Sequence, residues 1–318
     1  MRLFANANFD FLSRRKTAFT ISGAVFVVLL GLSFTWLFGR GSAFNYGVDF
    51  TGGTLVQVHF YEPTSVGELR EIIAPVAPGT EITRFGADDE YLFRAPDFAE
   101  EEGTALSDQI IETIGAHFSA DAFEITRTEA VGPKVGGELQ QKAILAIALS
   151  LIAILLYLAI RFEWRFGVAA VGATAHDLIL ALLIISAFRL EVSLTTVAAV
   201  LTIIGYSLND KIIVFDRIRE NLRGAGRKFD FIEVLNRSIN ETLPRTIMTS
   251  VTTLVTLMAL FLVGGTILQE FALILILGIV IGTYSSIFIG SPLLYYTERR
   301  WPRAEARTTT RTPARARA

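Results

Sequence analysis

Three polar residues interrupt a segment that is otherwise apolar enough to cross a membrane. Asn209, Asp210 and Lys211 lie within the apolar run 194–215, and a string of charged residues follows at 216–220. A charge near the middle of a membrane helix costs about 2.5–3.5 kcal/mol on insertion scales, and such residues usually face the protein interior and line an ion or substrate path. Asp210 is therefore the first candidate for a functional group, and its chemistry would be the binding and release of a proton.

Polar residues follow two of the apolar runs at helical spacing. Asn209 and Asp210 share their run with Thr202 and Tyr206, at offsets that place the four on one face of a helix. The next run has a similar stripe, made by Arg245, Thr249, Thr252, Thr253 and Thr256. Two antiparallel helices would bring Asp210 and Arg245 to similar depth, so we expect the two stripes to face each other and to line a polar pathway.

Asp210 and Arg245 are expected to act together as a proton switch. Burial favours the neutral form of a carboxyl group and a nearby arginine favours the carboxylate, so moving the arginine away favours protonation. Two structural alternatives stay open, because the pair could be a static contact and the hydroxyl stripes could simply hold helices together. Lys211 is expected to extend toward the lipid headgroups, with a role in the chemistry as the alternative.

A second polar pair, His176 and Asp177, lies about ten residues into its apolar run, roughly 15 Å deep at 1.5 Å per residue. The histidine could relay protons, or it could cap a backbone or hydrogen-bond across helices, and Asp177 is the better candidate of the two. The other histidines, His59 and His117, are distant and the chain has no cysteine, so no metal or cofactor site is expected. No Ser/His/Asp or Cys/His arrangement suits nucleophilic catalysis, so the chain is not expected to be an enzyme.

The composition sets the class of protein. Of the 318 residues, 52% are hydrophobic and only 19% are charged, which is too apolar for a soluble protein and indicates several membrane spans. Residues 17–38 are expected to be a retained first span, because the run is too long for a signal peptide and lacks a good cleavage site. The further spans are expected at 143–160, 167–188, 194–215, 246–263 and 267–295, with a tight turn at 189–191 that joins two helices, an amphipathic piece at 229–239, and Pro244 near a helix start.

An acidic insert separates the first two spans. Residues 40–141 contain 18 Asp and Glu against 6 Arg and Lys. Alternating and helical patterns predict strands at 53–60, 81–85, 91–94 and 123–129 and helices at 65–74 and 105–118, in the βαββαβ order of the ferredoxin-like unit. Two glycine pairs flank the domain, Gly52–Gly53 and Gly136–Gly137. Their spacing excludes a phosphate-binding loop, and we expect them to be hinges where the chain leaves and re-enters the membrane.

The distribution of Arg and Lys sets the orientation of the six spans. Positive charge is concentrated in 1–16, 161–165, 216–245 and the tail, so both termini are expected in the cytoplasm and the acidic domain outside. The predicted organisation is an N-terminal segment (1–16), a first span (17–38), an extracytoplasmic α+β domain (40–141), a bundle of helices 2–6 (142–296) and a basic disordered tail (297–318). The tail is expected to meet anionic lipid or a ribosome surface and not a specific nucleic-acid site. Within the last span, Gly278, Gly282, Ser286 and Gly290 form a small-residue ridge that permits close helix contact.

Five motifs, in order, resemble the SecF family of the bacterial Sec protein-export machinery. They are YGVDFTGGT at Tyr46–Thr54, VGPKVGGEL at Val131–Leu139, AHDLI at Ala175–Ile179, GYSLNDKIIVFDRIREN at Gly205–Asn221 and LPRTIMTSVTT at Leu243–Thr253. The resemblance runs over nearly all of residues 8–297, and the joint occurrence of five motifs is specific.

The resemblance implies an accessory subunit of the bacterial inner membrane whose six spans pair with six from SecD, as in resistance-nodulation-division transporters. It implies that this complex uses the proton motive force to promote late preprotein translocation and release, after the SecYEG channel and the SecA ATPase have threaded the chain; YajC is a further candidate partner. Carried over by motif, Asp210 and Arg245 would lie on the proton route. Two alternatives remain: a proton-driven efflux transporter of the same superfamily, which would need more spans and larger outer domains, and a non-conducting scaffold.

Overall fold

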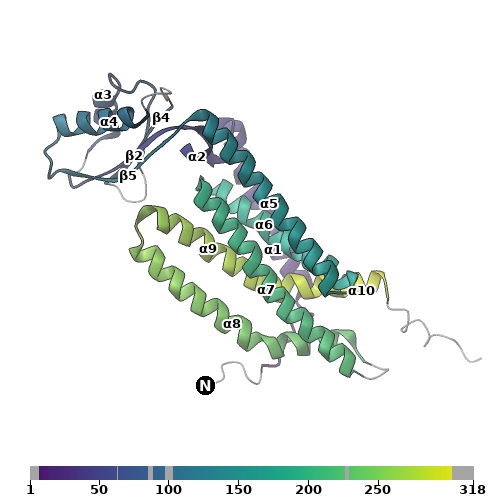
Figure 1. The fold of residues 1–318 in the computed structure, drawn as a ribbon. Helices are drawn as coiled ribbons and strands as arrows, with labels where there is room; N and C mark the ends of the chain where they lie inside the picture. Colours follow the sequence, from purple (N-terminus) through teal and green to yellow (C-terminus); the bar gives the residue numbers. More distant parts are fainter. Residues whose placement is uncertain (1–6, 63, 85–88, 97–102, 226–228, 303–318) are drawn as a thin grey trace, which may run out of the picture. The chain divides into compact units, whose positions relative to one another are not determined.

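The computed structural model describes residues 7–62, 64–84, 89–96, 103–225 and 229–302 (Figure 1). The described residues divide into two compact units: one contains those within 1–43, 150–188 and 199–318, and the other contains those within 44–149 and 189–198. Most of the predicted basic tail, the first residues of the chain and part of the turn between the second and third predicted strands lie outside the described residues. In the described part, six helices are long and apolar enough to cross a membrane, as predicted.

The long helices overlap the predicted spans and extend beyond them. They are α1 (Arg15–Arg40), α5 (Pro133–Arg161), α6 (Trp164–Ala187), α7 (Leu194–Gly224), α8 (Phe231–Val263) and a last span in which α9 (Gly265–Ser285) continues through the π-helical segment η1 (Ser286–Gly290) into α10 (Ser291–Arg300). Helices α8 and α9 pack closely as a hairpin (Figure 1). The charged residues after the apolar run of α7 and before that of α8 are helical, so both helices carry polar extensions.

Helix α8 corrects the prediction that Pro244 lies near a helix start. The helix begins at Phe231, where the Asp230 side chain accepts a hydrogen bond from a first-turn amide, and it continues to Val263 with Pro244 inside it. The predicted amphipathic piece 229–239 is therefore the first part of this helix. A proline inside a helix removes one backbone hydrogen bond. Membrane helices tolerate it because neighbouring helices and Ser or Thr side chains can satisfy the freed groups.

The predicted small-residue ridge on the last span is confirmed as a close contact between helices. A Cβ atom added to Gly278 would overlap the side chain of Ile203 on α7, and one added to Gly282 would lie 3.2 Å from Cβ of Ser207. Without side chains at these positions, α9 approaches α7 to nearly backbone distance. This contact holds α7, the helix that carries the candidate carboxylate of Asp210, against α9.

The second unit contains the predicted α+β domain, and its topology matches the prediction. The strands β2 (Gly53–Phe60), β3 (Glu81–Arg84), β4 (Glu90–Ala95) and β5 (Phe123–Val131) form a sheet in the order β3-β4-β2-β5, with each neighbouring pair antiparallel. Helices α3 (Val66–Ile73) and α4 (Gly103–His117) connect β2 to β3 and β4 to β5. Both helices cover one face of the sheet, because Leu69 of α3 and Ile110 of α4 join Val56 of β2 in one buried cluster. This is the strand order of the ferredoxin-like fold.

A short parallel pair of strands lies outside the prediction. Strand β1 (Asn45–Tyr46), which precedes the one-turn helix α2 (Val48–Thr51), pairs with β6 (Glu191–Val192). The segment expected to be only a turn between helices therefore belongs to the unit that contains the α+β domain. Its Glu191 side chain is 2% exposed and lies 2.9 Å from Nη2 of Arg94 on β4. A two-residue strand has no periodicity, so its pattern in the sequence carries no signal.

The Arg94–Glu191 pair is expected to stabilise the unit that contains the α+β domain. Replacing Arg94 with Met leaves a buried carboxylate without its cation, and we expect a loss of about 2–4 kcal/mol in the free energy of unfolding. The double variant R94M/E191Q should lose less than the sum of the two single variants. Thermal denaturation of the purified protein measures both effects, with Arg70→Met, at an exposed position on α3, as the control. A cycle in which the two losses simply add would show that the pair contributes nothing.

Candidate functional site

Lys211 lies in the interior of the bundle, so the prediction that it extends toward the lipid headgroups is wrong. Its side chain is 0% exposed, and its Nζ lies 2.6 Å from Oδ2 of Asp177 on α6, whose side chain is 1% exposed. Ser207, one turn earlier on α7, bonds to both charged groups through its hydroxyl. A lysine extends to the headgroups only when its stem faces lipid, whereas this residue faces α6, which supplies an opposite charge within reach.

The ion pair continues into a chain of hydrogen bonds across three helices. His176 Nδ1 lies 2.8 Å from Oδ1 of Asp177, and His176 Nε2 bonds to the hydroxyl of Ser22 on α1. With an ionised Asp177, Nδ1 is the donor and Nε2 accepts the hydroxyl proton in the neutral ring. The histidine therefore does bond across helices. A relay function for it stays a prediction.

Asp210 is buried next to this network without belonging to an ion pair. Its residue is 1% exposed, and its Oδ2 is buried with no hydrogen-bond partner. In the part of the chain that the structure describes, no cation lies within 4.0 Å of its carboxylate, although Lys211 and Arg245 are close enough to act on it electrostatically. A buried carboxylate without a partner is costly unless it is protonated or a cation approaches. This position is therefore suited to binding a proton.

One residue of the predicted stripes, Tyr206, belongs to a hydroxyl cluster between helices. The Tyr206 hydroxyl of α7 donates to Oγ of Ser250 on α8 at 3.3 Å, and Ser250 lies 2.7 Å from the hydroxyl of Thr283 on α9. Ser250 and Thr283 were not among the predicted residues. Ser250 directly follows Thr249, a residue of the predicted α8 stripe. The cluster joins three helices on the side where α7 faces α8.

The remaining stripe residues do not share the buried surface of Asp210. Thr202, Asn209 and Arg245 are exposed on this chain. The threonine hydroxyls of α8 donate to main-chain carbonyls of their own helix, at Thr249, Thr252, Thr253 and Thr256. The expected single face is thus divided into a buried part with the carboxylate and an exposed part with the arginine. The assignment of the stripes to a polar pathway stays a prediction.

The two glycine pairs meet where the α+β domain joins α5. Gly52 and Gly53 have φ values of +73° and +111°, and a Cβ atom on Gly53 would lie 2.6 Å from the carbonyl oxygen of Ala95. Gly136 lies inside α5, where its Cβ would be 3.0 Å from the amide nitrogen of Gly52, whereas Gly137 has open space. Three of the four positions therefore serve a close approach of backbones. Their function as hinges stays a prediction.

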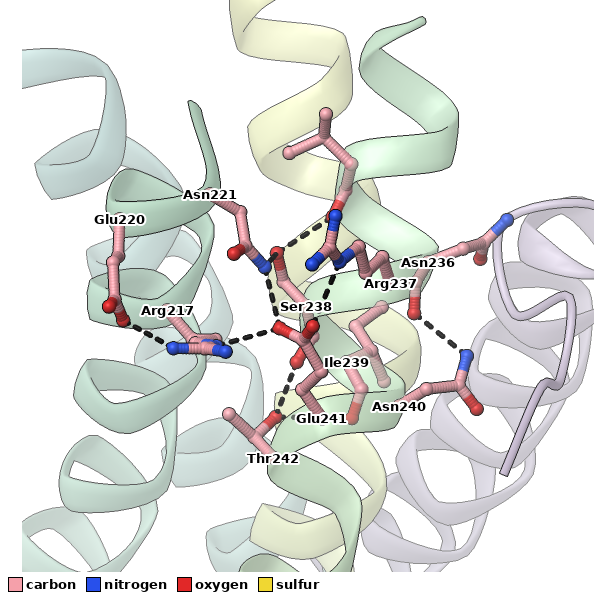
Figure 2. A network of polar contacts seen from close by, with 11 residues as sticks. Arg217, Glu220, Asn221, Asn236, Arg237, Ser238, Ile239, Asn240, Glu241 and Thr242 are labelled. Carbon is pink, nitrogen blue, oxygen red and sulfur yellow. Dashed lines mark hydrogen bonds and ion pairs between the residues drawn. The ribbon is translucent and has the colours of Figure 1, made fainter. Parts of the chain in front are cut away.

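A polar network that the sequence analysis missed joins the extensions of α7 and α8 (Figure 2). Glu241 accepts hydrogen bonds from Arg217 and Asn221, both at 2.7 Å, and from Arg237 at 2.8 Å. Arg217 also pairs with Glu220. The charged string that follows the apolar run of α7 was the sequence signal for this network. The acceptor Glu241 lies on a different helix, so the string alone does not identify it. The network holds α7 and α8 together beyond their apolar parts.

Together these features define a polytopic membrane protein with a buried charged network in its helical bundle and a ferredoxin-like domain after its first span. Residues 110–300 match the family model for the C-terminal part of SecD/SecF protein export membrane proteins, and residues 36–60 match the SecD/SecF GG motif. The chain is 44% identical over 317 residues to protein translocase subunit SecF of Gemmatimonas aurantiaca, covering 98% of this chain and 93% of that protein. The SecF subunit of Vibrio alginolyticus is 43% identical, with 92% and 90% covered. The chain belongs to the SecF family of protein translocase subunits.

A solved structure agrees with this assignment. The crystal structure of SecDF, a translocon-associated membrane protein from Thermus thermophilus, superposes with a TM-score of 0.79 at 37% identity over 93% of this chain. The chain spans 39% of the length of that SecDF protein. The protein is therefore an accessory subunit of Sec protein export and a multi-pass protein of the bacterial inner membrane.

Proposed function

We propose that this subunit, in a complex with SecD, uses the proton motive force to promote the late stage of preprotein translocation and release. The observation that carries the proposal is Asp210, a buried carboxylate with an unpartnered oxygen, near Lys211 on its own helix and Arg245 on α8. A proton that binds Asp210 removes its attraction for the arginine, and release of the proton restores it. Alternation between these states would move α7 against α8 with each proton.

The other polar residues extend this route. His176 and Asp177 would pass protons through their hydrogen-bonded chain, and Asn209 would contribute from the exposed side of α7. A polar or charged side chain that faces lipid is costly, so the exposure of Asn209 and Arg245 on this chain supports a partner that covers this face in the membrane. SecD is the proposed occupant, and residues 40–141 would contact both SecD and the preprotein.

The proposed topology follows from charge. Arg and Lys are concentrated in 1–16, 161–165 and 216–245, which supports cytoplasmic termini and an extracytoplasmic α+β domain. The complex would act after the SecYEG channel and SecA, with YajC as a further candidate partner. The proposed cycle moves protons and helices, forms no covalent bond and uses no cofactor.

Replacing Asp210 with Asn tests this function. The amide keeps the size of the side chain but cannot release a proton, so the proton-dependent part of preprotein translocation into membrane vesicles should be lost, while the complex with SecD still assembles. Asp216→Asn is the matched control, because Asp216 lies beyond the apolar run of the same helix and pairs with Arg161 at the surface. Full proton-dependent translocation by an assembled Asp210→Asn complex would instead show that the subunit is a scaffold.

A further inference from the structure

The ammonium group of Lys211 is fully bonded. Its three protons have three acceptors, namely Oδ2 of Asp177, the hydroxyl of Ser207 and the main-chain oxygen of Ser207. The Asp177 carboxylate is itself held by His176, which bonds to Ser22 on α1. The positive charge of Lys211 is thus held by Asp177 on α6 and by Ser207 on its own helix, and cannot approach Asp210 without breaking these bonds.

Arg245 differs from Lys211 in each of these respects. Its side chain is exposed on this chain, and its guanidinium forms no hydrogen bond or ion pair with any residue that the structure describes. Within this chain, Asp210 is therefore near one cation that hydrogen bonds hold in place and one that no described residue holds. The charge of the held cation is present in both states of a switch, whereas the arginine contributes in only one.

We infer that Lys211, held by Asp177, is a positioning residue that sets how readily Asp210 takes up and releases its proton. This inference rests on the proposed proton function of Asp210. A fixed cation near a carboxylate favours its ionised form, so Asp210 could release its proton even while Arg245 is away. Without Lys211, the carboxyl group would keep its proton in both states and the cycle would stall.

Few other charges bear on this site. In the described bundle, α6 contributes His176 and Asp177, α7 contributes Lys211, and α8 contributes Arg245. Helix α9 faces α7 with glycines, and α1 reaches the network with a serine hydroxyl.

The test compares the pH dependence of proton-driven translocation for the complex with SecD in membrane vesicles. The double variant D177N/K211M removes opposite charges together, so neither is left buried alone. Its pH of half-maximal activity should move up by about one unit, because the nearer charge that it removes is the cation. Lys211→Arg keeps both charges of the pair and should retain the parent midpoint.

The outcomes distinguish the inference from the proposed function. If Asp210→Asn abolishes proton-driven translocation but the double variant keeps the parent pH profile, Lys211 is purely structural and the inference is wrong. An upward shift in the double variant together with an unchanged midpoint in Lys211→Arg supports it, since a packing defect would lower activity without moving the midpoint. A double-variant complex that assembles with SecD but has no proton-driven translocation at any pH would show that Asp177 itself carries protons, and would overturn the inference. If Asp210→Asn retains the parent activity and profile, the proposed function and the inference both fail.

Discussion

Replacing Lys211 with Met is expected to destabilise the bundle by about 3–5 kcal/mol, the usual cost of removing one partner from a buried ion pair. The loss arises because Asp177, with a side chain that is 1% exposed, would keep hydrogen bonds from His176 and Ser207 but lose the lysine charge. Thermal unfolding of the purified complex and the amount of subunit retained in membranes with SecD both measure the effect.

Two further variants make this prediction specific. D177N/K211M should regain much of the lost stability, because replacing a whole buried pair by neutral groups is often neutral. Lys142→Met on α5 is the control for a surface ion pair, since Lys142 is 72% exposed and lies 3.8 Å from Glu138; its stability should match the parent. A Lys211→Met protein as stable as the parent would contradict the buried pair.

Replacing Gly53 with Ala is expected to disrupt the start of strand β2, where it packs against the end of β4 in the α+β domain. Its φ of +111° strains any residue with a side chain, and the added Cβ would lie 2.6 Å from a main-chain oxygen of β4 that cannot turn away. We expect a loss of about 3–5 kcal/mol and faster cleavage of the α+β domain by protease added to the purified protein.

Gly137→Ala is the matched control for this substitution. Gly137 lies inside α5 with nothing within 4 Å of its added Cβ, so alanine should stabilise the helix by about 0.5–1 kcal/mol. The two glycine-to-alanine changes should therefore have opposite signs. Equal and small effects at both positions would show that the close approach at Gly53 is not required.

Much of the architecture was predictable because its signals are local. Apolar runs of sufficient length predicted the six spans, and alternating and helical patterns predicted the βαββαβ order that the sheet confirms. Spacing of four predicted a ridge for close helix contact that includes Gly278 and Gly282, and the structure shows that its partner is α7. Each of these features depends on residues close together in the chain, whose periodicity matches the geometry of one helix or strand.

The errors occurred where the partner comes from elsewhere in the chain. Pro244 has the sequence context of a helix start, yet packing continues the helix through it. The turn at 189–191 gained a strand from a partner more than a hundred residues away, Asn45–Tyr46. Pattern alone contains no information about such partners.

The sequence by itself determined that a carboxylate stands in a membrane helix among other polar groups, and five motifs showed the resemblance to the SecF family. Only the tertiary structure decided which cation each carboxylate meets: Lys211 is bound to Asp177, and Asp210 is left with an unpartnered oxygen. A uniformly apolar helix has no distinct polar face to show which way its few polar side chains point. That choice depends on which neighbouring helix can satisfy a buried charge.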